Sequence, residues 1–223
     1  MEFKWAFRNL SVVAVLGLVG VFFFTNTRGF SKNYLETRIP STDKRYETFN
    51  RCFKLMEERN AKILVETGRA RNGCQNCAGD GCSTVVFAGW AKDHAASLFS
   101  IDIDPVAVAE SKKVVELINP SVQFFVQDSI AFLRGFNQKI DFLYLDSYDF
   151  DFDDPLPSQL HHLNEIMAVY PHLKKETIVM IDDCDLPHGG KGKLAIEFLQ
   201  NLGWKVLLSR YQTILVYDET HSR

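Results

Sequence analysis

Acidic side chains directly follow five successive apolar runs of this chain. They are Glu66, then Asp102 and Asp104, then Asp128, then Asp146 and Asp149, and finally Asp182 and Asp183. Aspartate is a common helix N-cap and turn residue, so a single acid at such a place carries little information. Acids after five runs in succession are harder to explain by capping alone. We therefore expect a shared ligand site among them.

Two positions after these runs suit the binding of a nucleoside. Asp102 follows the second run, where an acid can accept hydrogen bonds from both hydroxyls of a ribose. Gly68 follows the first run and, lacking a Cβ, lets the backbone approach a ligand closely. The pattern Gly-x-Gly-x-x-Gly is absent after the first run, which argues against a nicotinamide oxidoreductase.

The elements that would position these residues alternate between strand and helix. Short Val/Ile/Leu/Phe-rich runs without strict polar alternation are typical of parallel strands buried on both faces. We predict strands at 63–65, 97–101, 122–126, 140–145, 177–181, 204–208 and 213–217, and helices at 42–60, 83–92, 105–118, 129–134, 157–172 and 191–202. The fold class is therefore α/β: a Rossmann-like, doubly wound, mostly parallel seven-stranded sheet with an antiparallel C-terminal edge, preceded by an N-terminal apolar helix. In an open sheet of this kind ligands bind beyond the carboxyl ends of the strands.

The order of these motifs resembles that of the class I S-adenosylmethionine (SAM)-dependent methyltransferases, over about residues 61–217. Glu66-Thr67-Gly68 resembles their first motif but is followed by a long cysteine-bearing insertion. The resemblance implies SAM as cofactor, with Asp102 at the ribose and Asp128-Ser129 at the adenine. The implied cofactor-binding residues are Glu66, Gly68, Ser83, Thr84, Asp102, Asp128, Ser129 and Asp146.

A narrower resemblance concerns Asp146 with Asp182 and Asp183. In the metal-dependent O-methyltransferases of the catechol and macrocin type, acids at these strand ends hold Mg²⁺, a cation that prefers oxygen ligands. This resemblance implies a metal-assisted transfer to a hydroxyl of a small molecule, because the metal would lower the pKa of that hydroxyl. The alternative is that Asp182 and Asp183 merely end a strand and cap a turn.

Two residues are candidates for the general base. Asp149 is near Asp146 in sequence, and His188 has an unperturbed pKa suited to proton transfer at neutral pH. The alternative is that His188 is a solvated loop residue. The acidic stretch 149–154 is either a substrate loop or a solvated turn, and His161 and His162 are expected to be structural or exposed.

Three of the five cysteines, Cys74, Cys77 and Cys82, lie in one glycine-rich stretch. They are free thiols in a loop, or a disulfide if the domain faces an oxidising compartment, or part of a metal site. A zinc site would normally need a fourth ligand of suitable spacing, and no second paired Cys or His set is present.

Residues 10–24 are uncharged and almost wholly apolar, with basic residues on both flanks. Fifteen residues fall between a secretory h-region and a membrane-spanning helix of about 20 residues. The segment is an uncleaved single-pass anchor, a cleaved signal peptide that would make the protein secreted, or a buried or interfacial helix. We expect three regions: residues 1–30 as anchor or signal, 31–60 as linker and amphipathic helix, and 61–223 as the methyltransferase domain.

Composition narrows the classes of partner. The net charge is −3 and no basic stripe stands out, so we expect a small-molecule acceptor and no nucleic acid. The main rival is a membrane-anchored glycosyltransferase with Asp102-Ile103-Asp104 or Asp151-Phe152-Asp153 as a metal-binding Asp-x-Asp. A non-catalytic SAM-binding module is the other alternative, since fold alone does not fix function.

Overall fold

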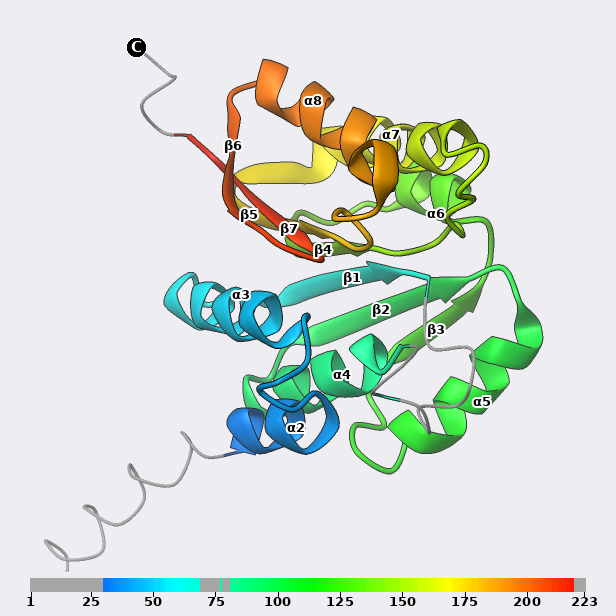
Figure 1. Ribbon diagram of the computed structural model, residues 1–223. Helices are drawn as coiled ribbons and strands as arrows, with labels where there is room; N and C mark the ends of the chain where they lie inside the picture. Colours follow the sequence, from blue (N-terminus) through cyan, green and yellow to red (C-terminus); the bar gives the residue numbers. More distant parts are fainter. Residues whose placement is uncertain (1–29, 69–76, 78–80, 219–223) are drawn as a thin grey trace, which may run out of the picture.

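A computed structural model describes residues 30–68, 77 and 81–218 of the chain, and one seven-stranded sheet is its centre (Figure 1). The strands are β1 (Ile63–Thr67), β2 (Ser97–Asp102), β3 (Gln123–Val126), β4 (Ile140–Leu145), β5 (Leu173–Ile181), β6 (Trp204–Ser209) and β7 (Thr213–Tyr217). Their order across the sheet is β3-β2-β1-β4-β5-β7-β6. Strands β1 to β5 run parallel, and β7 pairs antiparallel with both β5 and β6. The predicted fold class, including the antiparallel C-terminal edge, is confirmed.

Helices cover both faces of the sheet, as Figure 1 shows. They are α2 (Phe30–Arg38), α3 (Tyr46–Glu58), α4 (Ser83–Asp93), α5 (Pro105–Val115), α6 (Ser129–Gly135), α7 (Leu156–Val169) and α8 (Lys193–Asn201), with short 3-10 turns at Tyr170–His172 and Pro187–Gly189. One buried apolar cluster joins α2, α3 and α4 to the sheet. The other joins α6, α7 and α8 to the opposite face.

Two of the strand-end acids have a local role in starting helices. Asp104 accepts a hydrogen bond from the backbone N–H of Val106 at 2.8 Å, and Pro105 occupies the first turn of α5. Asp128 likewise accepts from the backbone N–H of Ala131 at 2.8 Å at the start of α6. Capping therefore accounts for part of the acid pattern.

The chain before the sheet differs from the predicted linker. Residues 30–38 form helix α2, whose Leu35 is buried, as is Ile39 just beyond it. Gly89 of α4 makes room for this helix, since a Cβ there would lie 2.5 Å from the Tyr34 ring. The segment is thus a packed part of the domain.

The expectation of a single-pass membrane protein needs correction. Within the part of the chain that the structure describes, no helix has both the length and the apolar character to cross a membrane. The apolar residues 10–24, on which that expectation and the N-terminal apolar helix rested, lie outside the described residues.

Candidate active site

The carboxyl ends of β1, β4 and β5 lie side by side. The backbone hydrogen bonds between neighbouring strands continue for one residue beyond these ends. The N–H of Asp146 donates to the carbonyl of Thr67 at 2.9 Å, and the N–H of Asp182 donates to that of Leu145 at 3.0 Å. Strands β1 and β4 are neighbours at the point where the strand order reverses. This is where ligands bind in open α/β sheets.

Gly68 ends β1 with φ of +75°, a left-handed conformation that favours glycine. A Cβ there would lie 2.0 Å from the carbonyl oxygen of Asp146. No other residue would allow β1 and β4 to approach so closely at the mouth of the site.

A cavity of about 420 Å³ opens at this switch point. Its lining residues are Gly68, Asp102, Ile103, Asp104, Ala107, Asp146, Ser147, Tyr148 and Asp149. Asp102 accepts a hydrogen bond from the backbone N–H of Asp104 at 2.8 Å, which fixes its carboxylate at the rim. The cavity unites Gly68, Asp102 and Asp146 of the predicted cofactor set with Asp149, the candidate base. We call it the cofactor cavity.

The other predicted cofactor residues do not line this cavity. Glu66 is fully buried and accepts from the hydroxyls of Ser83 and, at 3.0 Å, Ser100. It thereby ties β1 to α4 and β2. Thr84 is also fully buried, in the first turn of α4. These side chains hold the elements around the cavity together.

Asp128 and Ser129 lie at the start of α6, outside the cavity lining. Asp128 is exposed and caps the helix. The Ser129 hydroxyl lies 3.1 Å from Nε2 of His161 on α7, so that it links α6 to α7.

Three carboxylates converge beside the cofactor cavity, from Asp146, Asp182 and Asp183. One ligand atom from each lies within 4.8 Å of the others, and no other set of acids, cysteines and histidines among the described residues converges in this way. The structure thus brings together the three predicted metal ligands.

A fourth residue, Lys191, lies among these acids. Its ammonium nitrogen is 2.8 Å from Oδ1 of Asp146 and 2.9 Å from Oδ2 of Asp183, and its side chain is only 4% exposed. Burial alone would lower the pKa of Lys191, but Asp146 and Asp183 raise it, so the side chain is an ammonium ion. We call Asp146, Asp182, Asp183 and Lys191 the acid–lysine cluster.

The acids of this cluster differ in their pKa values. Burial, followed by the charges of Asp146 and Asp183, raises the pKa of Asp182 well above its ordinary value. Burial would also raise the pKa of Asp183, but Lys191 and the Tyr211 hydroxyl lower it. At neutral pH Asp183 is therefore a carboxylate, and Asp182 is the cluster's preferred site for a proton.

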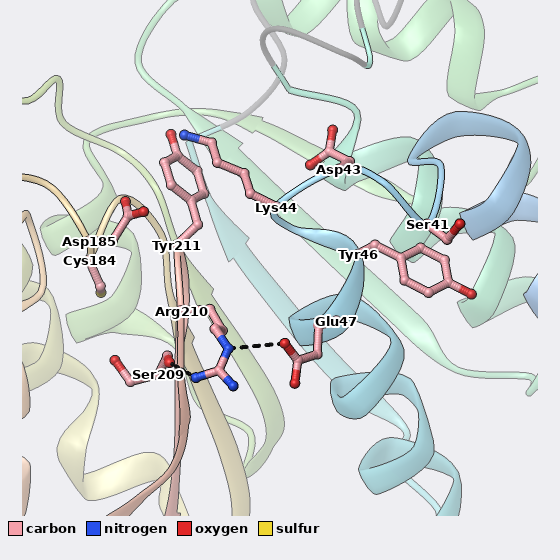
Figure 2. A pocket seen from close by; sticks show the side chains of 10 residues that line it. All are labelled: Ser41, Asp43, Lys44, Tyr46, Glu47, Cys184, Asp185, Ser209, Arg210 and Tyr211. Carbon is pink, nitrogen blue, oxygen red and sulfur yellow. Dashed lines mark hydrogen bonds and ion pairs between the residues drawn. The ribbon is translucent and has the colours of Figure 1, made fainter.

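A second hollow, of about 620 Å³, is lined by residues before and at the start of α3, by Cys184 and Asp185 after β5, and by residues at the β6–β7 turn (Figure 2). Tyr211, in the turn between β6 and β7, donates its hydroxyl hydrogen bond to Asp183. The Lys44 ammonium lies 3.3 Å from the centre of the Tyr211 ring, and Arg210 pairs with Glu47 of α3 at 3.0 Å. We call this space the outer hollow.

The two candidate bases have different surroundings. Asp149 is exposed and lines the cofactor cavity. His188 is exposed in a left-handed turn with φ of +60°, and it lines neither the cofactor cavity nor the outer hollow. The acidic stretch forms a turn, in which Asp151 accepts from the backbone N–H of Asp153 at 2.9 Å. Both Asp-x-Asp sequences therefore use an acid in local backbone hydrogen bonds.

Helix α7 contributes a buried polar network that the sequence did not reveal. Glu165 is fully buried and accepts from the Ser147 hydroxyl at 2.7 Å, next to Asp146. Burial raises the pKa of Glu165 to about 7 and lowers that of His162 to about 3. His162 donates through Nδ1 to the carbonyl of Ser158 at 2.8 Å. The expectation that His162 is structural agrees with this burial.

A disulfide joins Cys77 to Cys82, immediately before α4. Arg45 lies between α2 and α3 and donates to the carbonyls of Cys77 and, at 3.0 Å, Gly81. Asp43 pairs with the same guanidinium at 2.8 Å. Of the alternatives for this cysteine stretch, the structure contains the disulfide; Cys74 lies outside the described residues.

The fold is an α/β domain with a cavity at the strand ends, the place where open sheets of this kind bind ligands. A family model described as a methyltransferase domain matches residues 78–184, which include Asp102, Asp128, Asp146, Asp182 and Asp183. This match spans just under half of the chain, and together with the fold it makes the chain similar to the class I SAM-dependent methyltransferases.

Solved structures of the same fold include three methyltransferases. The O-methyltransferase NovP is 15% identical with a TM-score of 0.57, over 79% of this chain and 80% of that one. PaMTH1 of Podospora anserina, solved with S-adenosylhomocysteine (SAH), is 14% identical with a TM-score of 0.57, over 96% and 100%. A putative caffeoyl-CoA O-methyltransferase of Staphylococcus aureus is 13% identical with a TM-score of 0.56, over 92% and 98%.

Among curated proteins, a 53-residue stretch is 40% identical to large ribosomal subunit protein uL4 of Aquifex aeolicus (strain VF5). The match spans 24% of this chain and 27% of that protein. A similarity confined to so short a stretch does not show that the two proteins share a family.

Proposed function

We propose that the protein transfers the methyl group of SAM to an oxygen of a small-molecule acceptor. The observation that carries this proposal is a chain of side-chain contacts that runs from the cofactor cavity through the acid–lysine cluster to the outer hollow. Asp146 lines the cavity, Asp183 contacts Tyr211 of the hollow, and Lys191 bridges the two acids. A cofactor on one side and an acceptor on the other would meet at the acid–lysine cluster.

The chemistry needs little from the protein beyond position. SAM supplies the electrophilic methyl group, so the protein has to hold the acceptor oxygen in line and exclude water. The carbon–sulfur bond breaks as the oxygen–carbon bond forms, and the acceptor's proton is lost. Asp149 lies in the cofactor cavity, and we propose it as the base that accepts this proton.

Two further considerations support an oxygen of a small molecule. NovP and the Staphylococcus aureus protein, which share the fold, are described as O-methyltransferases. The net charge of −3 gives no general attraction for a phosphate backbone.

Cofactor binding is tested by unfolding with and without SAH. At SAH near 100 times its Kd, the free energy of unfolding should rise by about 2.7 kcal/mol. Asp102→Ala should weaken SAH binding about 10- to 100-fold, because a charged hydrogen-bond acceptor for the ribose is lost. Asp151→Ala, an exposed acid outside the cavity lining, is the matched control and should bind SAH like the wild type.

The transfer itself is tested with SAM carrying a labelled methyl group. The protein is mixed with panels of small hydroxyl compounds, amines, thiols and RNA, and the labelled product is identified. We expect an O-methyl ether or ester. Labelling of only RNA, or of only nitrogen or sulfur, would overturn the proposed acceptor while leaving the family intact.

A further inference from the structure

The backbone around Lys191 is built to bring this side chain into the cluster. The N–H of Lys191 donates to the carbonyl of Asp183 at 3.1 Å. Its two neighbours are glycines: a Cβ at Gly190 would lie 2.0 Å from the Asp183 carbonyl oxygen, and one at Gly192 would lie 2.6 Å from Sγ of Cys184. The Gly-Lys-Gly segment therefore lies directly against the loop that carries the acids.

The Lys191 ammonium contacts two of the three carboxylates that a divalent cation at this place would need. The three acids offer the oxygen ligands that suit Mg²⁺, but Asp146 and Asp183 each already contact the ammonium. A divalent ion beside it would meet strong repulsion between like charges. Displacing Lys191 would leave a buried ammonium without its partners, which is strongly unfavourable. The described residues therefore do not fit a resident Mg²⁺.

We propose that Lys191 replaces the divalent cation in this methyltransferase and holds the acceptor oxygen itself. The inference rests on the proposed function. An ammonium has three N–H donors, and the contacts with Asp146 and Asp183 account for two of them. Lys191 is buried and lines neither space itself, but its partner Asp146 lines the cofactor cavity and its partner Asp183 contacts Tyr211 of the outer hollow. We therefore expect the third donor to reach an acceptor oxygen bound beside these acids.

This arrangement restricts the acceptor. A single ammonium polarises a bound hydroxyl less than a divalent Lewis acid does. The favoured acceptors are therefore oxygens that ionise readily in water, such as phenols, enols and carboxylic acids. In the step, the ionised oxygen attacks the methyl carbon, the bond to the SAM sulfur breaks, and neutral SAH leaves; the acceptor's proton has gone to Asp149 or to water.

The first test needs only the wild-type protein. We expect methyl transfer that is unchanged by excess chelator or by added Mg²⁺, and no saturable Mn²⁺ binding by calorimetry or electron paramagnetic resonance. Transfer that requires Mg²⁺, or saturable Mn²⁺ binding that Asp182→Asn abolishes, would overturn the role of Lys191.

The second test removes the ammonium. Lys191→Ala should gain Mn²⁺ affinity by at least about tenfold, because the acids lose their internal cation. Its KM for a phenol acceptor should rise at least about tenfold, while SAH binding is retained. The matched control is Lys193→Ala, an exposed lysine two residues further on, which should change neither quantity.

The outcomes separate this inference from the proposed function. A wild-type protein that binds SAH but methylates no oxygen acceptor contradicts the proposed function. One that methylates oxygen only with Mg²⁺ leaves the function intact and contradicts the lysine inference alone. Were Lys191→Ala to fail to fold, Lys191→Met, which keeps most of the side-chain volume, would be measured in its place.

Discussion

Glu165 shows how a residue outside the cofactor cavity can affect the site. Its Oε1 accepts from the Ser147 hydroxyl at 2.7 Å and lies 3.7 Å from Nε2 of His161. Its Oε2 lies 4.0 Å from Nε2 of His162. Ser147 follows Asp146 directly, so Glu165 is a positioning residue for the strand end that carries the cluster.

The raised pKa of Glu165 predicts a particular dependence of stability on pH. The pKa of this carboxyl rises from 4.5 in the unfolded chain to about 7 in the folded protein. Between pH 4.5 and pH 7 the folded state therefore binds more protons than the unfolded state. The free energy of unfolding that it contributes therefore falls as pH rises through this window. The titratable groups facing it are His161 and His162 of the same helix, whose pKa values burial lowers, and the charged group facing it is Lys191 from the loop before α8.

Glu165→Gln should remove this loss of stability at higher pH. Glutamine does not ionise, and its side chain keeps an oxygen that can accept from the Ser147 hydroxyl. Near pH 8 the variant should be more stable than the wild type, by at most on the order of 3 kcal/mol, and near pH 5 the difference should shrink. Urea unfolding at both pH values measures it. Glu197→Gln, at an exposed position on α8, is the control. A difference that is equal at the two pH values would contradict the assignment.

At the scale of elements, the contact of α2 with α4 depends on the absence of a Cβ at Gly89. Gly89→Ala would place a Cβ 2.5 to 3.0 Å from three atoms of the Tyr34 ring. We expect a loss of about 1–3 kcal/mol in the free energy of unfolding, since overpacking forces a shift of the helices. Chemical denaturation measures the loss.

A second variant and a control make this prediction specific. Tyr34→Ala in the Gly89→Ala background should recover part of the loss, because the clashing ring is gone. Gly135→Ala in α6 meets nothing within 4 Å and should leave stability nearly unchanged or slightly raised. Equal effects of the two glycine variants would refute the role given to Gly89.

The elements whose signal is local could be predicted from the sequence. Strand β4 was predicted with its observed bounds, Ile140–Leu145, because a short and almost continuous run of apolar residues can be recognised without knowledge of its distant partners. Helix α2 was missed because only Leu35 and Ile39 signal its burial, and its partner surface is created by Gly89. Strand β5 begins four residues earlier than predicted, where Lys174 donates its N–H to the Thr177 hydroxyl.

Some residues of the candidate active site could be predicted from the sequence, and others could not. Acids at strand ends are visible in sequence, so the convergence of Asp146 and Asp182 could be predicted from topology. Lys191 could not, because lysine is rarely buried and its partner Asp146 is 45 residues away. Glu66 was predicted to bind the cofactor; the structure adds that its buried carboxylate accepts from two serine hydroxyls and so links β1 to neighbouring elements, which sequence could not show.

At the scale of the whole molecule, Arg45 connects the segment between α2 and α3 to the segment that precedes α4. Its guanidinium, in a residue that is 6% exposed, contacts Asp43 before α3 and the carbonyls of Cys77 and Gly81 before α4. Buried guanidinium groups that meet several oxygen partners fix the relative position of the segments they join. The disulfide and Arg45 therefore stabilise the same connection.

Reduction of the Cys77–Cys82 disulfide should weaken this connection measurably. Closing so short a loop is worth about 2 kcal/mol through the entropy of the unfolded chain. We expect the free energy of unfolding to fall by about that amount in reductant, as measured by urea titration. In the Cys77→Ser, Cys82→Ser double variant the loss should already be present, and reductant should change nothing more. Cys52, which is free and fully buried, is not expected to contribute. A wild type that is insensitive to reductant, with a double variant equally stable, would show that Arg45 alone holds the segment.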